Sequence, residues 1–436
     1  MNSYTIYAPA TGIKNLAINI IRISGNKSAE LLEKLTLKKI PESRVLSLRK
    51  LYDPKTKKLL DFCLVVWMPG PKSYTGEDSF EIHCHGGNAT IEKFFSVFND
   101  IKYLRLAVEG EFTKRAIMNG KIDLIKAEAI KDVIYAQSDK QRDLAIKQLA
   151  GGVSIPLKKW KELILSIMAK LETTIDFSDE EDVPEKIAVE KKLKNLLKSF
   201  RSVLDNSGNT HLITEGIKLA IIGKANVGKS SIFNRITKEE KSIVTNIPGT
   251  TRDVIEARID LKGFNILLYD TAGINKSKDI IELEGIRRAK KIKKKADLVL
   301  EILDATDKTS SIVKKNTLVV FNKSDLLKKR TKLKKNQYYF SAKTGEGLGE
   351  LLESITRIIL KKTKRLEETD QLLTTLRQKK ELEEAVFEIE HAIKEERIEI
   401  KAEHLRVVNH KLARLLGIID IEDVLENIFK DFCIGK

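Results

Sequence analysis

The spacing of apolar and polar positions changes along the chain, and each change predicts a different kind of structure. Up to about residue 118, short runs rich in β-branched and aromatic residues are separated by turn-forming stretches, which predicts strands at 16–23, 62–68 and 80–85 in a mixed α/β segment. From about 121 to 215 apolar residues recur at helical spacing with few breakers. A second α/β stretch then runs to about residue 362, and the chain reads as helical from there to its end.

The second α/β stretch contains four apolar runs, KLAIIG, NILLYD, LVLEILD and TLVVF, which alternate with helical stretches. Strands that alternate with helices predict a parallel sheet covered by helices on both faces. Helical stretches flank this unit on both sides. Because the termini of a domain often lie close together, we expect an α/β domain inserted into one helical domain.

A phosphate-binding motif opens this unit. GKANVGKS, from Gly223 to Ser230, follows the run KLAIIG and precedes a helical stretch, which is the context that makes G-x-x-x-x-G-K-[ST] credible. Its glycines let backbone N–H groups surround phosphate oxygens at a helix start. We expect Lys229 to neutralise the β- and γ-phosphates, as a catalytic residue, and Ser230 to bind Mg²⁺.

Further guanine-nucleotide motifs follow in the expected order, and they predict a Ras-like GTPase. DTAG begins at Asp270, NKSD ends at Asp325 and SAK follows a short apolar run. A carboxylate at Asp325 would accept from both N–H groups of guanine, a donor pair that adenine lacks. Thr251 is expected to reach Mg²⁺. The predicted GTP-binding residues are Asn226, Val227, Gly228, Lys229, Ser230, Ser231, Thr245, Asn246, Ile247, Pro248, Gly249, Thr250, Thr251, Asp270, Thr271, Ala272, Gly273, Asn322, Lys323, Asp325, Ser341, Ala342 and Lys343.

One residue departs from the Ras pattern. Ras-like GTPases place a glutamine directly after D-x-x-G to orient the attacking water, and this chain has Ile274 there. An isoleucine side chain cannot hydrogen-bond, so another group must position the water.

The composition indicates the cellular compartment of the protein and the chemical class of its partner. The net charge of +17 favours a polyanionic partner, although the basic runs at 287–295 and 328–335 read more simply as solvated faces than as RNA contacts. No run approaches the ~18 apolar residues of a membrane span, and the N-terminus does not read as a secretory signal. Three widely spaced cysteines indicate a reducing cytoplasm.

Other motifs make the chain resemble, almost from end to end, the MnmE (TrmE) family of tRNA-modification GTPases. They include RISG at 22–25, PGPKSYTGED at 69–78, HGG at 85–87, EGEF at 109–112, TNIPGTTRD at 245–253 and the terminal CIGK. The phosphate-binding motifs mark only a superfamily, whereas the first blocks and the terminal tetrapeptide are specific. The resemblance implies an α/β plus all-α fold with an N-terminal α+β folate-binding and dimerisation domain at 1–118, a helical domain at 119–214 and 363–436, and an inserted Ras-like P-loop G domain at 215–362.

The resemblance also assigns residues. It implies GTP hydrolysis stimulated by K⁺, with ligands at Asn226, Thr245, Ile247 and Thr250, and a water-orienting glutamate at Glu282, with the nearby Glu284 as the alternative. A cation there would supply the positive charge that an arginine finger brings elsewhere. The folate-binding positions are Arg22, Glu81, Lys121 and Lys436, and Cys433 is a candidate functional thiol.

In function, the resemblance implies a homodimer that works with an FAD-dependent protein, MnmG, in a heterotetramer. Together they would use a one-carbon tetrahydrofolate to place an aminomethyl or carboxymethylaminomethyl group on C5 of the wobble uridine of certain tRNAs. The alternative is a ribosome-assembly GTPase that acts as an rRNA-binding switch. Such a switch needs neither the first 120 residues nor the terminal tetrapeptide.

Overall fold

The computed structural model describes residues 4–12, 16–176, 183–239, 257–270, 296–307 and 316–419, together with Leu425 and Gly435. The chain divides into two compact units. The first consists of Met1–Lys131, Leu157–Ala169 and Leu405–Lys436, and the second of Asp132–Pro156 and Lys170–His404. Within the described ranges each unit contains one six-stranded sheet.

The N-terminal α/β segment confirms the three predicted strands as β2, β4 and β5 and adds three that the pattern did not indicate. Its elements are β1 (Thr5–Pro9), β2 (Ile18–Ser24), α1 (Ser28–Thr36), β3 (Ser47–Tyr52), β4 (Leu59–Met68), β5 (Ser79–His85), α2 (Asn88–Asn99), β6 (Leu104–Leu106) and α3 (Glu111–Met118).

The first sheet has the order β3-β4-β5-β2-β1-β6. Its pairs are antiparallel except for β1 and β6, which run parallel. Helices α1 and α2 pack on one face, over a core that includes Val65, Phe80 and Phe94. Along β4, Phe62 and Leu64 alternate with these buried positions and are 48% and 41% exposed. The face opposite the two helices therefore carries exposed apolar side chains.

The second sheet has the order β12-β11-β10-β7-β9-β8. Its strands run parallel as predicted, apart from the edge strand β8, which pairs antiparallel with β9. Lys262 and Gly263 join these two strands with positive φ at both residues, +52° and +82°, the backbone that a two-residue hairpin requires. The elements are β7 (Ile217–Gly223), α9 (Lys229–Glu239), β8 (Ala257–Leu261), β9 (Phe264–Asp270), β10 (Leu298–Asp304), β11 (Thr317–Asn322), η2 (Ser324–Leu326), β12 (Gln337–Tyr339) and α11 (Leu348–Glu367).

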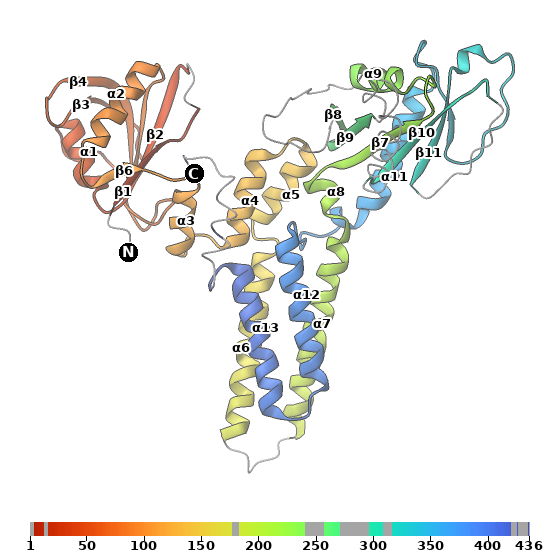
Figure 1. The fold of residues 1–436 in the computed structure, drawn as a ribbon. Helices are drawn as coiled ribbons and strands as arrows, with labels where there is room; N and C mark the ends of the chain where they lie inside the picture. The colour runs from red at the N-terminus through yellow and green to blue at the C-terminus, as the bar shows by residue number, and fades with distance from the viewer. Residues whose placement is uncertain are drawn as a thin grey trace, which may run out of the picture. The chain divides into compact units, whose positions relative to one another are not determined.

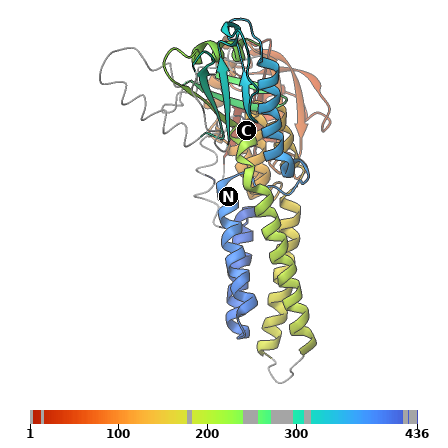
Figure 2. The ribbon, with the colours of Figure 1, turned by 90° about the vertical axis from the view of Figure 1, so that its right-hand side faces the viewer.

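The remaining elements are helical, as the pattern predicts. They are α4 (Leu124–Tyr135), α5 (Asp139–Leu149), α6 (Ser154–Asp176), α7 (Val183–Asn206), η1 (Ser207–Asn209), α8 (His211–Thr214), α12 (Leu376–Lys394) and α13 (Ile398–Leu416). Within the second unit α7 packs along α12 (Figures 1 and 2). Since α7 precedes the second sheet and α12 follows it, the sheet is inserted between helices that pack together. In the part of the chain described, no helix has the length and apolar character needed to cross a membrane.

Candidate nucleotide site and a second polar cavity

The predicted nucleotide motifs meet at one edge of the second sheet. The carboxyl ends of β7, β9, β10 and β11 lie side by side, where Gly223 pairs with Ile302, Asp270 with Ile221, and Asp304 with Asn322. Ligands of parallel α/β sheets bind at the carboxyl ends of the strands. The phosphate-binding loop, the strand end at Asp270 and the loop that follows Asn322 are therefore brought together.

The loop between β7 and α9 has the form of a phosphate cradle. The Nζ of Lys229 donates to the carbonyl oxygens of Gly223 at 3.0 Å and Lys224 at 2.7 Å, so its ammonium lies within the loop at the start of α9. This side chain is buried, whereas the neighbouring Ser230 is exposed. A buried ammonium, a helix N-terminus and an exposed hydroxyl provide the groups that a Mg²⁺-bound phosphate chain requires.

Gly228 is the residue that allows this loop to close. Its φ is +92°, and a Cβ built there would lie 2.2 Å from Nδ2 of Asn322. That Nδ2 donates to the carbonyl oxygen of Val227 at 2.8 Å. The Oδ1 of Asn322 accepts from the N–H of Ala342 at 3.1 Å. The buried Asn322 amide thus connects the phosphate-binding loop to the SAK loop.

The predicted base reader is an exposed carboxylate with a fixed orientation. Oδ1 of Asp325 accepts from the hydroxyl of Ser341 at 2.6 Å, and this hydrogen bond lowers the pKa of Asp325. The Ser341 hydroxyl in turn accepts from the N–H of Thr344 at 3.2 Å. Lys323 pairs with Asp304 at 2.6 Å. The arrangement offers an ionised acceptor to a ligand with two adjacent donors, as guanine has.

Several predicted site residues have no described environment. Of the two predicted Mg²⁺ ligands only Ser230 is described, and of the four K⁺ ligands only Asn226, which has a positive φ of +63°. The predicted residues that lie outside the described part of the chain are Thr245, Asn246, Ile247, Pro248, Gly249, Thr250, Thr251, Thr271, Ala272, Gly273, Glu282, Cys433 and Lys436.

A second candidate site is a cavity of about 240 Å³ beside the first sheet. Arg22 and Glu81, both predicted from the family resemblance, line it from the paired strands β2 and β5. Tyr74 and Phe112 also line it. These two aromatic residues had no predicted role, although they lie within the PGPKSYTGED and EGEF blocks.

Arg22 is the central residue of this cavity. Its Nε donates to Oε1 of Glu81 at 2.9 Å, and its guanidinium lies 5.7 Å from the ring centroid of Tyr74 and 5.8 Å from that of Phe112. Its Nη1 donates to the carbonyl oxygen of Gly435 at 3.4 Å. A Cβ on Gly435 would lie 2.2 Å from the carbonyl oxygen of Pro9. Gly435 therefore contacts a residue of the cavity wall from a position where a side chain would clash with Pro9.

Lys121, the third predicted folate residue, does not line the cavity among the residues described. Its Nζ donates to the carbonyl oxygen of Pro71 at 2.6 Å, and a Cβ on Gly76 would lie 3.2 Å from its side chain. Lys121 thus contacts the loop that carries Tyr74 rather than the cavity wall itself.

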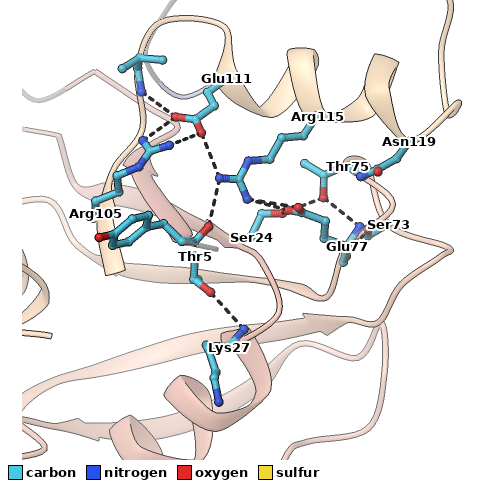
Figure 3. A network of polar contacts seen from close by, with 12 residues as sticks. Thr5, Ser24, Lys27, Ser73, Thr75, Glu77, Arg105, Glu111, Arg115 and Asn119 are labelled. Carbon is cyan, nitrogen blue, oxygen red and sulfur yellow. Dashed lines mark hydrogen bonds and ion pairs between the residues drawn. The ribbon is translucent and has the colours of Figure 1, made fainter. Parts of the chain in front are cut away.

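A buried polar network supports that loop (Figure 3). Arg115 donates to Glu77 at 3.0 Å and to Glu111 at 3.0 Å. Burial alone would raise the pKa of Glu111, but the hydrogen bonds from Arg105, the Val108 N–H and Arg115 hold it below its ordinary value. Removing one partner of such a buried pair leaves an uncompensated charge, which costs about 3–5 kcal/mol. The network therefore fixes the loop against α3.

Part of the network reaches the cavity directly. The hydroxyls of Ser24 and Thr75, which both line the cavity, lie 2.7 Å apart, and the Ser24 hydroxyl donates to Glu77 at 2.8 Å. Asn119 donates to the carbonyl oxygen of Thr75 at 2.7 Å. The cavity wall is thus held in place before any ligand binds.

Comparisons with known proteins place this architecture in context. Residues 5–121 match the family described as the GTP-binding protein TrmE N-terminus, and residues 124–433 match the MnmE helical domain. The tRNA modification GTPase MnmE of Pelagibacter ubique is 39% identical over 443 residues, which cover 99% of this chain and 100% of that protein. MnmE of Agrobacterium fabrum is 37% identical over 441 residues, which cover 99% of both chains.

Among solved structures, the G domain of the FeoB iron transporter of T. maritima is 29% identical over 32% of this chain and 97% of that one. Its TM-score of 0.24 is too low to establish a shared fold.

Proposed function

This chain belongs to the MnmE family of tRNA modification GTPases, and from that membership we propose its reaction. It is a K⁺-stimulated GTPase that works with an FAD-dependent partner of the MnmG type. Together they add an aminomethyl or carboxymethylaminomethyl group to C5 of the wobble uridine of certain tRNAs. The carbon comes from a tetrahydrofolate derivative.

In the GTPase half of the reaction, Lys229 binds the β- and γ-phosphates and Asp325 binds the guanine base. Ser230, with Thr251, holds Mg²⁺, which neutralises developing charge on the phosphates when bound. Glu282 orients the attacking water, a task that Ile274 cannot perform. Asn226, Thr245, Ile247 and Thr250 would hold K⁺, which would supply positive charge to the transition state. The described contacts that support this assignment are those of Lys229, Asn322 and Asp325.

The observation that carries the proposal beyond the GTPase is the cavity lined by Arg22 and Glu81, where Arg22 also donates to the carbonyl oxygen of Gly435. A pterin ring offers donor and acceptor edges that a carboxylate such as Glu81 can bind, and the glutamate tail of a folate attracts basic residues. We assign this cavity to the pterin, with Lys121 and Lys436 as the basic residues for the tail. A ribosome-assembly switch has no use for such a cavity or for the terminal tetrapeptide.

Binding of 5-formyltetrahydrofolate to the full chain, measured by calorimetry, tests this assignment. Arg22→Gln removes the cation that holds both Glu81 and the Gly435 carbonyl, so we expect affinity to fall at least about tenfold, or ~1.4 kcal/mol. Lys55→Gln is the matched control, because Lys55 is exposed and pairs with Asp100 on the surface of the same unit. No folate binding by a wild-type chain that hydrolyses GTP would favour the ribosome-assembly alternative.

We also propose that two copies of the chain associate through the first unit. Leu48, Phe62 and Leu64 are 66%, 48% and 41% exposed on neighbouring strands, and Leu48 pairs directly with Leu64. Contiguous exposed apolar residues of this kind mark an interaction surface. A sedimentation experiment that finds only monomer at micromolar concentration would refute the homodimer.

We further propose a heterotetramer with the FAD-dependent partner and a cytoplasmic location. We retain the domain limits 1–118, 119–214, 215–362 and 363–436 as part of this proposal. A reducing compartment agrees with Cys63 and Cys84, two buried free thiols. Burial raises the pKa of Cys84 to about 11, so this thiol remains protonated and unreactive.

A further inference from the structure

A groove of about 520 Å³ runs along one face of α7 beside the C-terminal part of α11. Lys194, Lys198 and Arg201 line it from successive turns of α7, and Arg365 lines it from α11. Asp205 is the acidic residue of the lining. Four cations against one anion make this a positively charged surface, and none of its lining residues lines either site described above.

The cations are available to a ligand. Among the residues that the structure describes, neither Lys198 nor Arg365 has an ion-pair partner. Lys194 and Arg201 pair with Glu190 at 2.5 Å and Glu390 at 2.8 Å, but their side chains remain 61% and 57% exposed. Exposed ion pairs of this kind contribute little to stability, so each cation can readily exchange its carboxylate for another anion.

The rest of the lining indicates which anion the groove would bind. Ser202 and Asn206 add neutral hydrogen-bonding side chains, Leu197 is apolar, and none of the described lining residues is aromatic. Lysine, arginine, serine and asparagine are typical contacts of nucleic-acid phosphates. Without an aromatic side chain on which a base could stack, the groove suits a sugar–phosphate backbone rather than bases.

The two walls of the groove are joined at one end. Asn209, in η1 after α7, donates from Nδ2 to the carbonyl oxygen of Lys362 in α11 at 2.9 Å. The hydroxyl of Ser207 accepts from the N–H of Leu373 at 2.8 Å. The first of these contacts connects the C-terminal end of α7 to α11, so the two walls of the groove are joined before a ligand binds.

We propose that this groove binds the phosphodiester backbone of the substrate tRNA. The inference rests on the proposed function, which supplies an RNA substrate. From Lys194 to Asn206 the lined face of α7 is about 18 Å long, so it can contact several consecutive phosphates. The contact is independent of base sequence and would position the tRNA rather than select it.

The test is the binding of a fluorescently labelled, unmodified tRNA transcript to the full chain, measured by anisotropy over a series of salt concentrations. The variant is Lys198→Glu with Arg365→Glu. Its matched control is Lys38→Glu with Lys39→Glu, which makes the same charge change at exposed residues of the first unit. GTP hydrolysis without tRNA and thermal melting are measured in parallel, and both should be unchanged in each variant.

We expect the groove variant to bind tRNA at least about tenfold more weakly, and the slope of log affinity against log salt to fall by roughly 1 to 2. The control should bind as wild type does. Wild-type affinity and slope in the groove variant would overturn the inference and leave the proposed function intact. A wild-type chain that hydrolyses GTP but binds no tRNA would overturn both. Loss of binding to an acidic protein, with tRNA binding retained, would reassign the groove to that partner.

Discussion

At the scale of single residues, Asn322 and Gly228 together determine the shape of the nucleotide site. The Asn322 amide hydrogen-bonds to Val227 in one loop and to Ala342 in another. It can approach the phosphate-binding loop only because residue 228 has no Cβ. A side chain at this position would therefore separate the loop that binds phosphates from the loop next to the base.

Gly228→Ala should weaken binding of a fluorescent GDP analogue at least about tenfold. The new methyl group would lie 2.2 Å from the Asn322 amide at a φ of +92°, and a strained backbone of this kind costs about 1–3 kcal/mol. Gly349→Ala is the control, since a Cβ there has no neighbour within 4 Å. Equal affinity for both variants in a fluorescence titration would show that the close contact with Asn322 has no role in binding.

The sequence indicates candidate residues for these loops, because the chemistry of phosphate and guanine requires particular side chains at fixed spacing. It identifies Asp325 as a base reader, and the hydrogen bond from Ser341 lowers the pKa of that carboxylate in the structure. Spacing along the chain could not place Gly435 beside Arg22, because 413 positions separate them. Only the folded chain brings these two residues together.

At the scale of elements, α8 is connected to the start of β10 by an ion pair. Nε2 of His211 lies 3.5 Å from Oδ1 of Asp297, and this contact raises the pKa of His211 above 6.5. Burial alone would raise the pKa of Asp297, but the hydrogen bonds from His211 and the Lys218 N–H hold it below 3.8. The charged pair therefore stabilises the folded state at pH values between the lowered pKa of Asp297 and the raised pKa of His211.

The pH dependence of stability follows from the directions of these two pKa shifts. The stabilisation from His211 is complete below pH 6.5 and is lost as pH rises through its raised pKa, while that from Asp297 is lost as pH falls below 3.8. In urea, His211→Gln should cost up to about 1 kcal/mol at pH 5.5 and almost nothing at pH 8.5, since the pair is partly exposed. His391→Gln is the control, because that ring bonds the Phe387 carbonyl. An equal loss for His211→Gln at both pH values would contradict the ion pair.

Elements with a strong apolar pattern are predicted from the sequence, and short edge elements are not. Strands β7, β9, β10 and β11 coincide with the four apolar runs. Strand β8 was not predicted, because it is short and its pairing depends on the turn at Gly263. In α12 the buried face runs through Leu382, Ala385, Ile389 and Ala392, whereas the apolar residues Val386 and Ile393 of the same helix are only partly buried.

At the scale of the whole molecule, the chain combines two sheets with different chemistry. The first carries a cavity with a paired arginine and glutamate, and the second carries a nucleotide site. The sequence predicts the inserted arrangement, because helical patterns flank the second sheet on both sides. It could not predict the groove along α7, since charged residues on a helix face look alike whether or not they line a groove.

The central claim is that the chain hydrolyses GTP with K⁺ as activator and Glu282 as the residue that orients water. The most direct test is steady-state GTP hydrolysis by wild type and Glu282→Ala in matched KCl and NaCl buffers. We predict stimulation by K⁺ of roughly 10- to 100-fold in the wild type, and loss of that stimulation in the variant. Equal slow turnover of the wild type in both salts, or unchanged turnover of Glu282→Ala in KCl, would contradict this account.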